Sequence, residues 1–182
     1  DNILNPGENI EIYAGKNTHL KGSIKNQVFV NSTIGRNFPG SEVFSSPVRY
    51  SLEGTLDLPY PVSFGKQVIL PNLKLTIEKG KVTEYQTTDP EKQKTLGFIL
   101  GSDEGVKEVG EIALGTNRAF NRPLLNSLYV EKVGGSIHIA LGFSHQSVKY
   151  DGKEINADNG VRSKHHIDLT FMMLPDYGGG KV

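Results

Sequence analysis

One short segment of the sequence combines the alternation of a β-strand with a side chain that is capable of binding a metal. In the run 136–142, Ile137, Ile139 and Leu141 alternate with His138 and with small residues. Successive side chains of a strand point to opposite faces of the sheet. The aliphatic side chains can therefore enter a core while His138 faces the other way, which predicts a functional site built on a sheet.

Two further segments repeat this pattern. His166 and Asp168 are two positions apart in an alternating run, and Glu111 lies in 109–114 on the face opposite large aliphatic residues. A single strand histidine is most often an ordinary surface or core residue, but these side chains together favour a metal site. Imidazole and carboxylate groups held by rigid strands suit a divalent-metal hydrolase, which needs fixed ligands and a free position for water.

Composition narrows the choice of chemistry. The 182 residues include no cysteine, and 20 basic residues balance 20 acidic ones. Disulfides, thiolate catalysis and cysteine-based zinc sites are thereby excluded, leaving His, Asp and Glu as metal ligands. No basic stretch interleaves with aromatic residues and no apolar run is long enough to cross a bilayer, so we expect neither nucleic acid nor membrane as partner. A cytoplasmic location is compatible with this composition.

The remaining pattern predicts an α+β domain dominated by a largely antiparallel or mixed sheet, with few helices. Glycine-containing turns predict hairpins at 72–85 and 148–155. Asp89 can cap a helix that begins at Pro90 and ends before Gly101, and a short helix is possible in 124–132. The expected strands are 9–13, 27–30, 72–77, 81–85, 107–115, 136–142 and 165–173.

Other candidate residues carry weaker signals. Glu42 follows a Pro-Gly turn, so we place it on a loop, where a carboxylate is usually unremarkable. His19 fits a turn or surface role, and His165 faces away from His166. Ser144 lacks the G-x-S-x-G context of a nucleophile elbow.

Four segments, in order through nearly the whole chain, resemble motifs of the thermophilic aminopeptidase T family of metallopeptidases. They are Phe38–Pro47, Val109–Leu114, Gly135–Gly142 and His166–Asp168. The resemblance implies that residues 1–182 correspond to the metal-bearing C-terminal domain, without the N-terminal α/β domain of the family. We accordingly expect an excised domain. The resemblance implies that the metal ligands are Glu42, Glu111, His138, His166 and Asp168.

The sequence departs from the family at one position. The family usually has tyrosine seven residues after the histidine of the His-Ile-Ala motif, where this chain has His145. Tyrosine there could hydrogen-bond a developing oxyanion; a protonated imidazole could do the same, or could shuttle a proton.

The implied activity is hydrolysis of N-terminal residues from peptides by two divalent ions, which could be zinc, cobalt or manganese. The implied catalytic residues are Glu42, Glu111 and His145. One glutamate could bridge the ions while the other assists proton transfer, and the sequence leaves that division open. We expect a homodimer. The alternative is a non-catalytic metal-binding or dimerisation domain of the same fold, which the His145 departure and the missing N-terminal domain both motivate.

Overall fold

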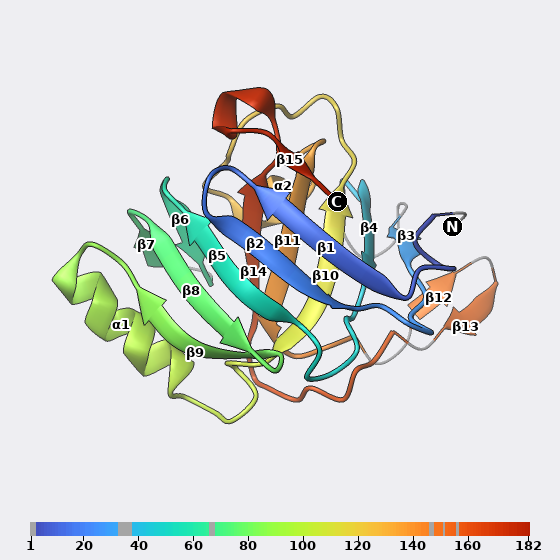
Figure 1. Cartoon of the computed structure of the whole chain (residues 1–182), viewed down its shortest axis with the longest axis horizontal. Helices are drawn as coiled ribbons and strands as arrows, with labels where there is room; N and C mark the ends of the chain where they lie inside the picture. The colour runs from blue at the N-terminus through green and yellow to red at the C-terminus, as the bar shows by residue number, and fades with distance from the viewer. Residues whose placement is uncertain (1–2, 33–37, 66–67, 146–147, 151, 156) are drawn as a thin grey trace.

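The computed structural model contains two antiparallel sheets packed face to face (Figure 1). The structure describes residues 3–32, 38–65, 68–145, 148–150, 152–155 and 157–182. The described strands are β1 (Asn9–Ala14), β2 (Thr18–Ser23), β3 (Val30–Ser32), β4 (Glu42–Ser45), β5 (Glu53–Leu58), β6 (Val62–Phe64), β7 (Val68–Leu70), β8 (Leu73–Glu78), β9 (Lys81–Gln86), β10 (Val109–Gly115), β11 (Ser136–Gly142), β12 (Val148–Tyr150), β13 (Lys153–Ile155), β14 (His166–Met172) and β15 (Gly180–Lys181). The helical elements are α1 (Pro90–Leu100), α2 (Ser127–Val130) and a single 3-10 turn (Pro175–Tyr177).

The larger sheet has the strand order β15-β1-β2-β5-β8-β9, and the smaller has the order β14-β11-β10-β4-β3. Two short ribbons, β6-β7 and β12-β13, complete the strands. Every pair of neighbouring strands that the structure describes in the two sheets is antiparallel. These features confirm the predicted α+β class with a largely antiparallel sheet.

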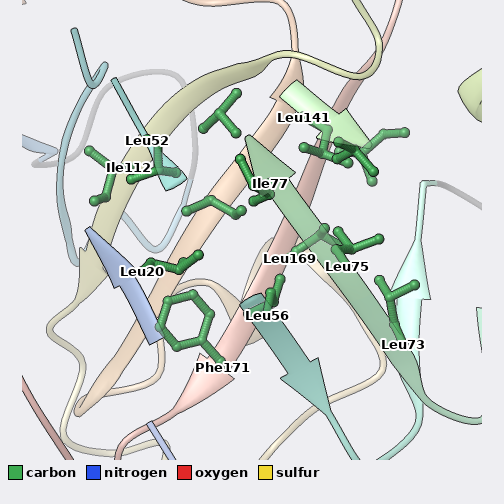
Figure 2. Packing of buried hydrophobic residues seen from close by; sticks show 14 of the residues in the cluster. Leu20, Leu52, Leu56, Leu73, Leu75, Ile77, Ile112, Leu141, Leu169 and Phe171 are labelled. Atoms are coloured by element: carbon green, nitrogen blue, oxygen red, sulfur yellow. The ribbon is translucent and has the colours of Figure 1, made fainter. Parts of the chain in front are cut away.

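The core lies between the two sheets. Leu56 and Leu75 of the larger sheet and Leu169 and Phe171 of the smaller sheet belong to one buried cluster (Figure 2). Ile139, from the alternating run around His138, is fully buried in the same cluster. Apolar burial of this extent is the main stabilising contribution to a domain of this size.

Helix α1 covers the edge of the larger sheet beside β9 (Figure 1). It begins as predicted: Asp89 accepts hydrogen bonds from the backbone N–H groups of Glu91 and Lys92, and Pro90 occupies the first turn. Leu96 and Leu100 are its buried residues. Within the described residues, no helix is both long and apolar enough to traverse a lipid bilayer.

The structure corrects one placement that matters for the site. Glu42 was expected on a loop, but it is the first residue of β4 and is buried. Only Ser41 separates the Pro39-Gly40 segment from Glu42, and the strand that begins there pairs with both β3 and β10. Pairing with a strand on each side therefore makes Glu42 a strand residue, although the Pro-Gly pair before it predicts a loop.

Other boundaries shift by a few residues. The strand expected at 27–30 begins only at Val30, because the backbone N–H of Phe29 donates to Asn5 Oδ1 instead of to a strand. The hairpin expected at 148–155 is present as β12 and β13, although Asp151 of its turn lies outside the described residues. His19 lies on the surface, on strand β2 and paired with Glu11.

Candidate metal centre

The site lies on the face of the smaller sheet that points away from the core. On neighbouring strands, Ala140 is paired with Glu111 on one side and with Asp168 on the other. In the adjacent row, His138 is paired with Ala113 and Thr170. The acidic and imidazole side chains of this face thus alternate with the small side chains of Ala113 and Ala140.

A β-bulge helps to aim Glu111. The pairing of β10 with β11 shifts register between Val109 and Glu111, so Gly110 is the extra residue. A Cβ at Gly110 would overlap the carbonyl oxygen of Gly142, and only glycine allows this close approach. Bulges bend a strand locally and re-aim the side chains beside them.

Glu111 is the centre of the cluster and is buried. Its Oε1 lies 3.2 Å from His138 Nε2, and its Oε2 lies 2.9 Å from His145 Nε2 and 3.4 Å from His166 Nε2. His166 Nε2 also lies 3.2 Å from Asp168 Oδ1. The two oxygens of one carboxylate therefore face imidazoles on opposite sides.

Two further acidic residues, Glu42 and Glu131, lie beside His138. Glu42 Oε2 lies 3.6 Å from His138 Nε2, and Glu42 Oε1 lies 2.6 Å from Lys132 Nζ. Lys132 Nζ is also 2.6 Å from Glu131 Oε1. Glu131 and Lys132 are both buried, and neither was predicted from the sequence.

The segment that carries Glu131 and Lys132 is held against the sheet by its backbone. The N–H of Asn117 donates to Lys132 O at 2.9 Å, and the N–H of Gly134 donates to Asn117 O at 2.8 Å. At Gly115, a Cβ would overlap the carbonyl oxygen of Val133. A glycine in β10 thus lets the segment cross closely over the end of the strand.

The donor atoms form three groups in which nitrogen and oxygen atoms lie within 4.8 Å of one another. Glu111 belongs to two of these groups and His138 to two. The groups are Glu111 with His145 and His166, Glu42 with Glu111 and His138, and Glu131 with His138 and Asp168.

The acidic and imidazole groups of the cluster shift one another's pKa values. Burial by itself would raise the pKa of Glu111, but hydrogen bonding to His138, His145 and His166 holds it well below its ordinary value. Burial opposes the charged form of His166, yet Asp168 and Glu111 raise its pKa to about 11. Burial and the nearby charge of Asp168 raise the pKa of Glu131 to about 8. The Asp168 and Glu111 carboxylates thus favour the protonated form of His166.

Contacts outside the cluster orient the histidines. His166 Nδ1 lies 2.7 Å from the carbonyl oxygen of Phe143, which leaves Nε2 directed at the carboxylates. Such a hydrogen bond on one ring nitrogen fixes the tautomer that a metal ligand needs. Ser144, next to His145, donates to Asp158 Oδ1 at 2.6 Å and so anchors the chain at the rim of the site.

The structure brings together all of the predicted site residues. Glu42, Glu111, His138, His145, His166 and Asp168 lie in one connected cluster, while His19 lies on the other sheet. His165 is directed elsewhere, with its Nε2 at 2.8 Å from Ser102 Oγ. The sequence signal for Glu131 and Lys132 was only the paired glycines that follow them, which indicate a tight return of the chain onto β11.

The arrangement defines a class of protein: a β-sheet scaffold whose outer face carries a cluster of histidines and carboxylates suited to divalent cations. A family model described as "Thermophilic metalloprotease (M29)" matches residues 2–174, and the chain belongs to this family.

Curated relatives agree with this assignment. The chain is 28% identical over 143 residues to aminopeptidase AmpS of Bacillus subtilis, covering 75% of this chain and 33% of that protein. It is 28% identical over 137 residues to aminopeptidase 2 of Geobacillus stearothermophilus, covering 72% of this chain and 30% of that protein. It is 27% identical over 139 residues to aminopeptidase T of Thermus thermophilus, covering 72% of this chain and 33% of that protein. The chain thus spans about a third of the length of these relatives.

Two solved structures share the fold. Wild-type AmpT from Thermus thermophilus superposes with a TM-score of 0.66 at 22% identity, covering 92% of this chain and 43% of that one. A 2,5-dihydroxypyridine dioxygenase from Pseudomonas putida superposes with a TM-score of 0.69 at 15% identity, covering 93% of this chain and 51% of that one. At these identities the likeness describes the fold alone.

Proposed function

We propose that this chain is the catalytic part of a metal-dependent aminopeptidase that binds two divalent ions and releases N-terminal residues from peptides. The observation that carries the proposal is the position of Glu111, whose two oxygens face two different groups of imidazole and carboxylate donors. The curated relatives of this chain are named aminopeptidases, which supports the proposed reaction class.

The residues present fit divalent ions. His138 Nδ1 is a buried polar atom with no hydrogen-bond partner among the described residues, and the other donors are imidazole nitrogens and carboxylate oxygens. This mixture of nitrogen and oxygen donors suits zinc, cobalt or manganese. The residues that would hold the ions are Glu42, Glu111, His138, His166 and Asp168, with Glu131 added from its place beside His138 and Asp168.

Two divalent ions, when bound, would lower the pKa of a water molecule and polarise the scissile carbonyl. The protein's own contribution is to hold the donors on rigid strands, with small residues between them. We assign to His145, whose side chain is 35% exposed, the role of donating a hydrogen bond to the substrate carbonyl as negative charge develops there. The peptide substrates, the homodimer and the cytoplasmic location stay predictions.

The rival proposal is a non-catalytic metal-binding or dimerisation domain, favoured by histidine in place of the family's tyrosine. We would measure release of amino acids from unblocked and N-acetylated peptides, with added zinc or cobalt and with chelator. An aminopeptidase cleaves only the unblocked peptide and only with metal. The same assay should be run on a protein as long as the relatives. If that protein binds metal but releases no amino acids, the result would favour the non-catalytic domain.

A further inference from the structure

Lys132 is the most unusual charged residue of the structure. Its side chain is 0% exposed, and its ammonium nitrogen lies 2.6 Å from Glu42 Oε1 and 2.6 Å from Glu131 Oε1. Lysine is almost never fully buried unless it is paired, because its charge loses hydration. Its burial here therefore depends on these two acidic side chains, and the Lys132 charge in turn favours the ionised form of Glu131 against burial and the charge of Asp168.

The ammonium group of Lys132 contacts both acidic side chains at short range. Burial by itself would lower the pKa of Lys132, but Glu131 and Glu42 raise it, so the fold favours the charged ammonium. Lys132 also cannot easily leave this position, because its carbonyl oxygen accepts from Asn117 and its neighbour Val133 packs against Gly115. The fold thus holds a cation between two carboxylates that come from separate elements.

These carboxylates belong to the metal centre. Glu42 shares a donor group with Glu111 and His138, and Glu131 shares one with His138 and Asp168. Lys132 takes one oxygen of Glu42 and one of Glu131, the position in which a bridging cation would otherwise bind. A divalent ion placed there would face the ammonium charge at close range, and two like charges repel strongly in a buried site.

We propose that Lys132 is a resident cation of the metal centre: it occupies the position between Glu42 and Glu131 and keeps a divalent ion out of it. Lys132 is a positioning residue by this inference, since it leaves each of the two carboxylates one oxygen to offer to a metal. The inference rests on the proposed metal binding of the site.

The test is a zinc titration by calorimetry, with bound ions counted by native mass spectrometry. The variants are Lys132→Met, which has similar length and no charge, and Lys132→Gln, which keeps hydrogen-bond donors without the charge. The matched control is Lys94→Met, which removes an exposed lysine paired with Glu91 at 2.7 Å. Circular dichroism with and without zinc reports whether each variant folds.

Compared with the unchanged protein, we expect both Lys132 variants either to bind one more zinc ion or to bind their weakest zinc ion at least about tenfold more tightly. We expect them to lose thermal stability without zinc and to regain it with zinc, while Lys94→Met behaves like the unchanged protein. A variant that folds only when zinc is present would support the inference equally.

Unchanged stoichiometry and affinity in both variants, or weaker binding, would overturn the inference while leaving the metal site in place. Variants that stay unfolded even with zinc would also overturn it, because a metal ion then cannot replace the ammonium group. Zinc binding by the variants alone would overturn the inference as stated, because Lys132 would then block the whole site and not one position within a working metal centre. No zinc binding by any of the proteins would overturn both.

Discussion

Two imidazoles beside Glu111, those of His138 and His166, set the pH dependence of metal binding at the residue scale. Glu111 and Asp168 have lowered pKa values and are already ionised at neutral pH. Burial opposes the charged form of His138, but Glu111, Asp168 and Glu42 together raise its pKa, and the pKa of His166 is raised to about 11. A metal ion must displace the protons on these two rings before it can bind.

We therefore predict that zinc binding at pH 7 releases about two protons or more, and that affinity rises with pH. The affinity rises with pH because the pKa values of these groups are raised. At higher pH the groups have already lost protons that the metal ion would otherwise have to displace. Glu131, with a pKa of about 8, adds to the effect. Calorimetry in buffers of different ionisation enthalpy measures the released protons. Binding that is independent of pH between 6 and 8 would contradict the raised pKa values of these groups.

His145 permits a second residue-scale prediction, because its ring is close to Glu111 yet reaches the rim. We expect His145→Phe to lower kcat/KM by about 100-fold, as the loss of one oxyanion donor does, without changing the number of bound ions. His145→Tyr should restore part of the activity, with a different pH profile. Loss of one metal ion in His145→Phe would instead identify this ring as a ligand, since its Nε2 lies in the same donor group as His166.

At the scale of elements, Gly115 connects strand β10 to the segment that crosses it. We predict that Gly115→Ala destabilises the protein by about 1–3 kcal/mol, because the added methyl group overlaps the carbonyl oxygen of Val133. Zinc affinity should also fall, since the displaced segment carries Glu131. Gly97→Ala is the control: it lies within α1, where its Cβ would contact only the side chain of Tyr85. Equal denaturant midpoints and zinc affinities for Gly115→Ala and the unchanged protein would rule out this role.

Alternation within strands was enough to predict most of the elements that build the site. The faces of β10, β11 and β14 follow from which residues are large and aliphatic, and the structure buries Ile112, Ile139 and Leu169 together. Strand β5 was missed although Leu56 and Leu58 alternate in it, because Gly54 and nearby prolines resemble a loop. Local pattern therefore predicts the faces of strands better than it predicts which loops become strands.

The part of the site that could not be predicted depends on contacts distant in the sequence. Glu42 becomes a strand residue because β3 and β10 pair with β4 on both sides. Glu131 and Lys132 reach the site because Asn117 holds their segment by backbone hydrogen bonds. Neither contact can be recognised from the neighbouring sequence, whereas the two-residue spacing of His166 and Asp168 can.

At the scale of the whole molecule, the core and the candidate site occupy opposite faces of one sheet. His138 and Ile139 are consecutive and both fully buried, yet only Ile139 belongs to the hydrophobic cluster. Stability and metal binding should therefore respond separately to substitutions at these adjacent positions.

We predict that Ile139→Val lowers the free energy of unfolding by about 0.5–1.5 kcal/mol, because it removes one buried methylene group from the core, and leaves zinc affinity unchanged. His138→Gln should abolish binding of at least one zinc ion, because His138 belongs to two donor groups, while the metal-free protein still unfolds cooperatively. Denaturant unfolding without metal and zinc titration of the folded proteins measure the two properties independently. If Ile139→Val weakened zinc binding as much as His138→Gln does, the two faces of the sheet would be coupled. The ligands would then depend on core packing for their positions, and not only on the strands that carry them.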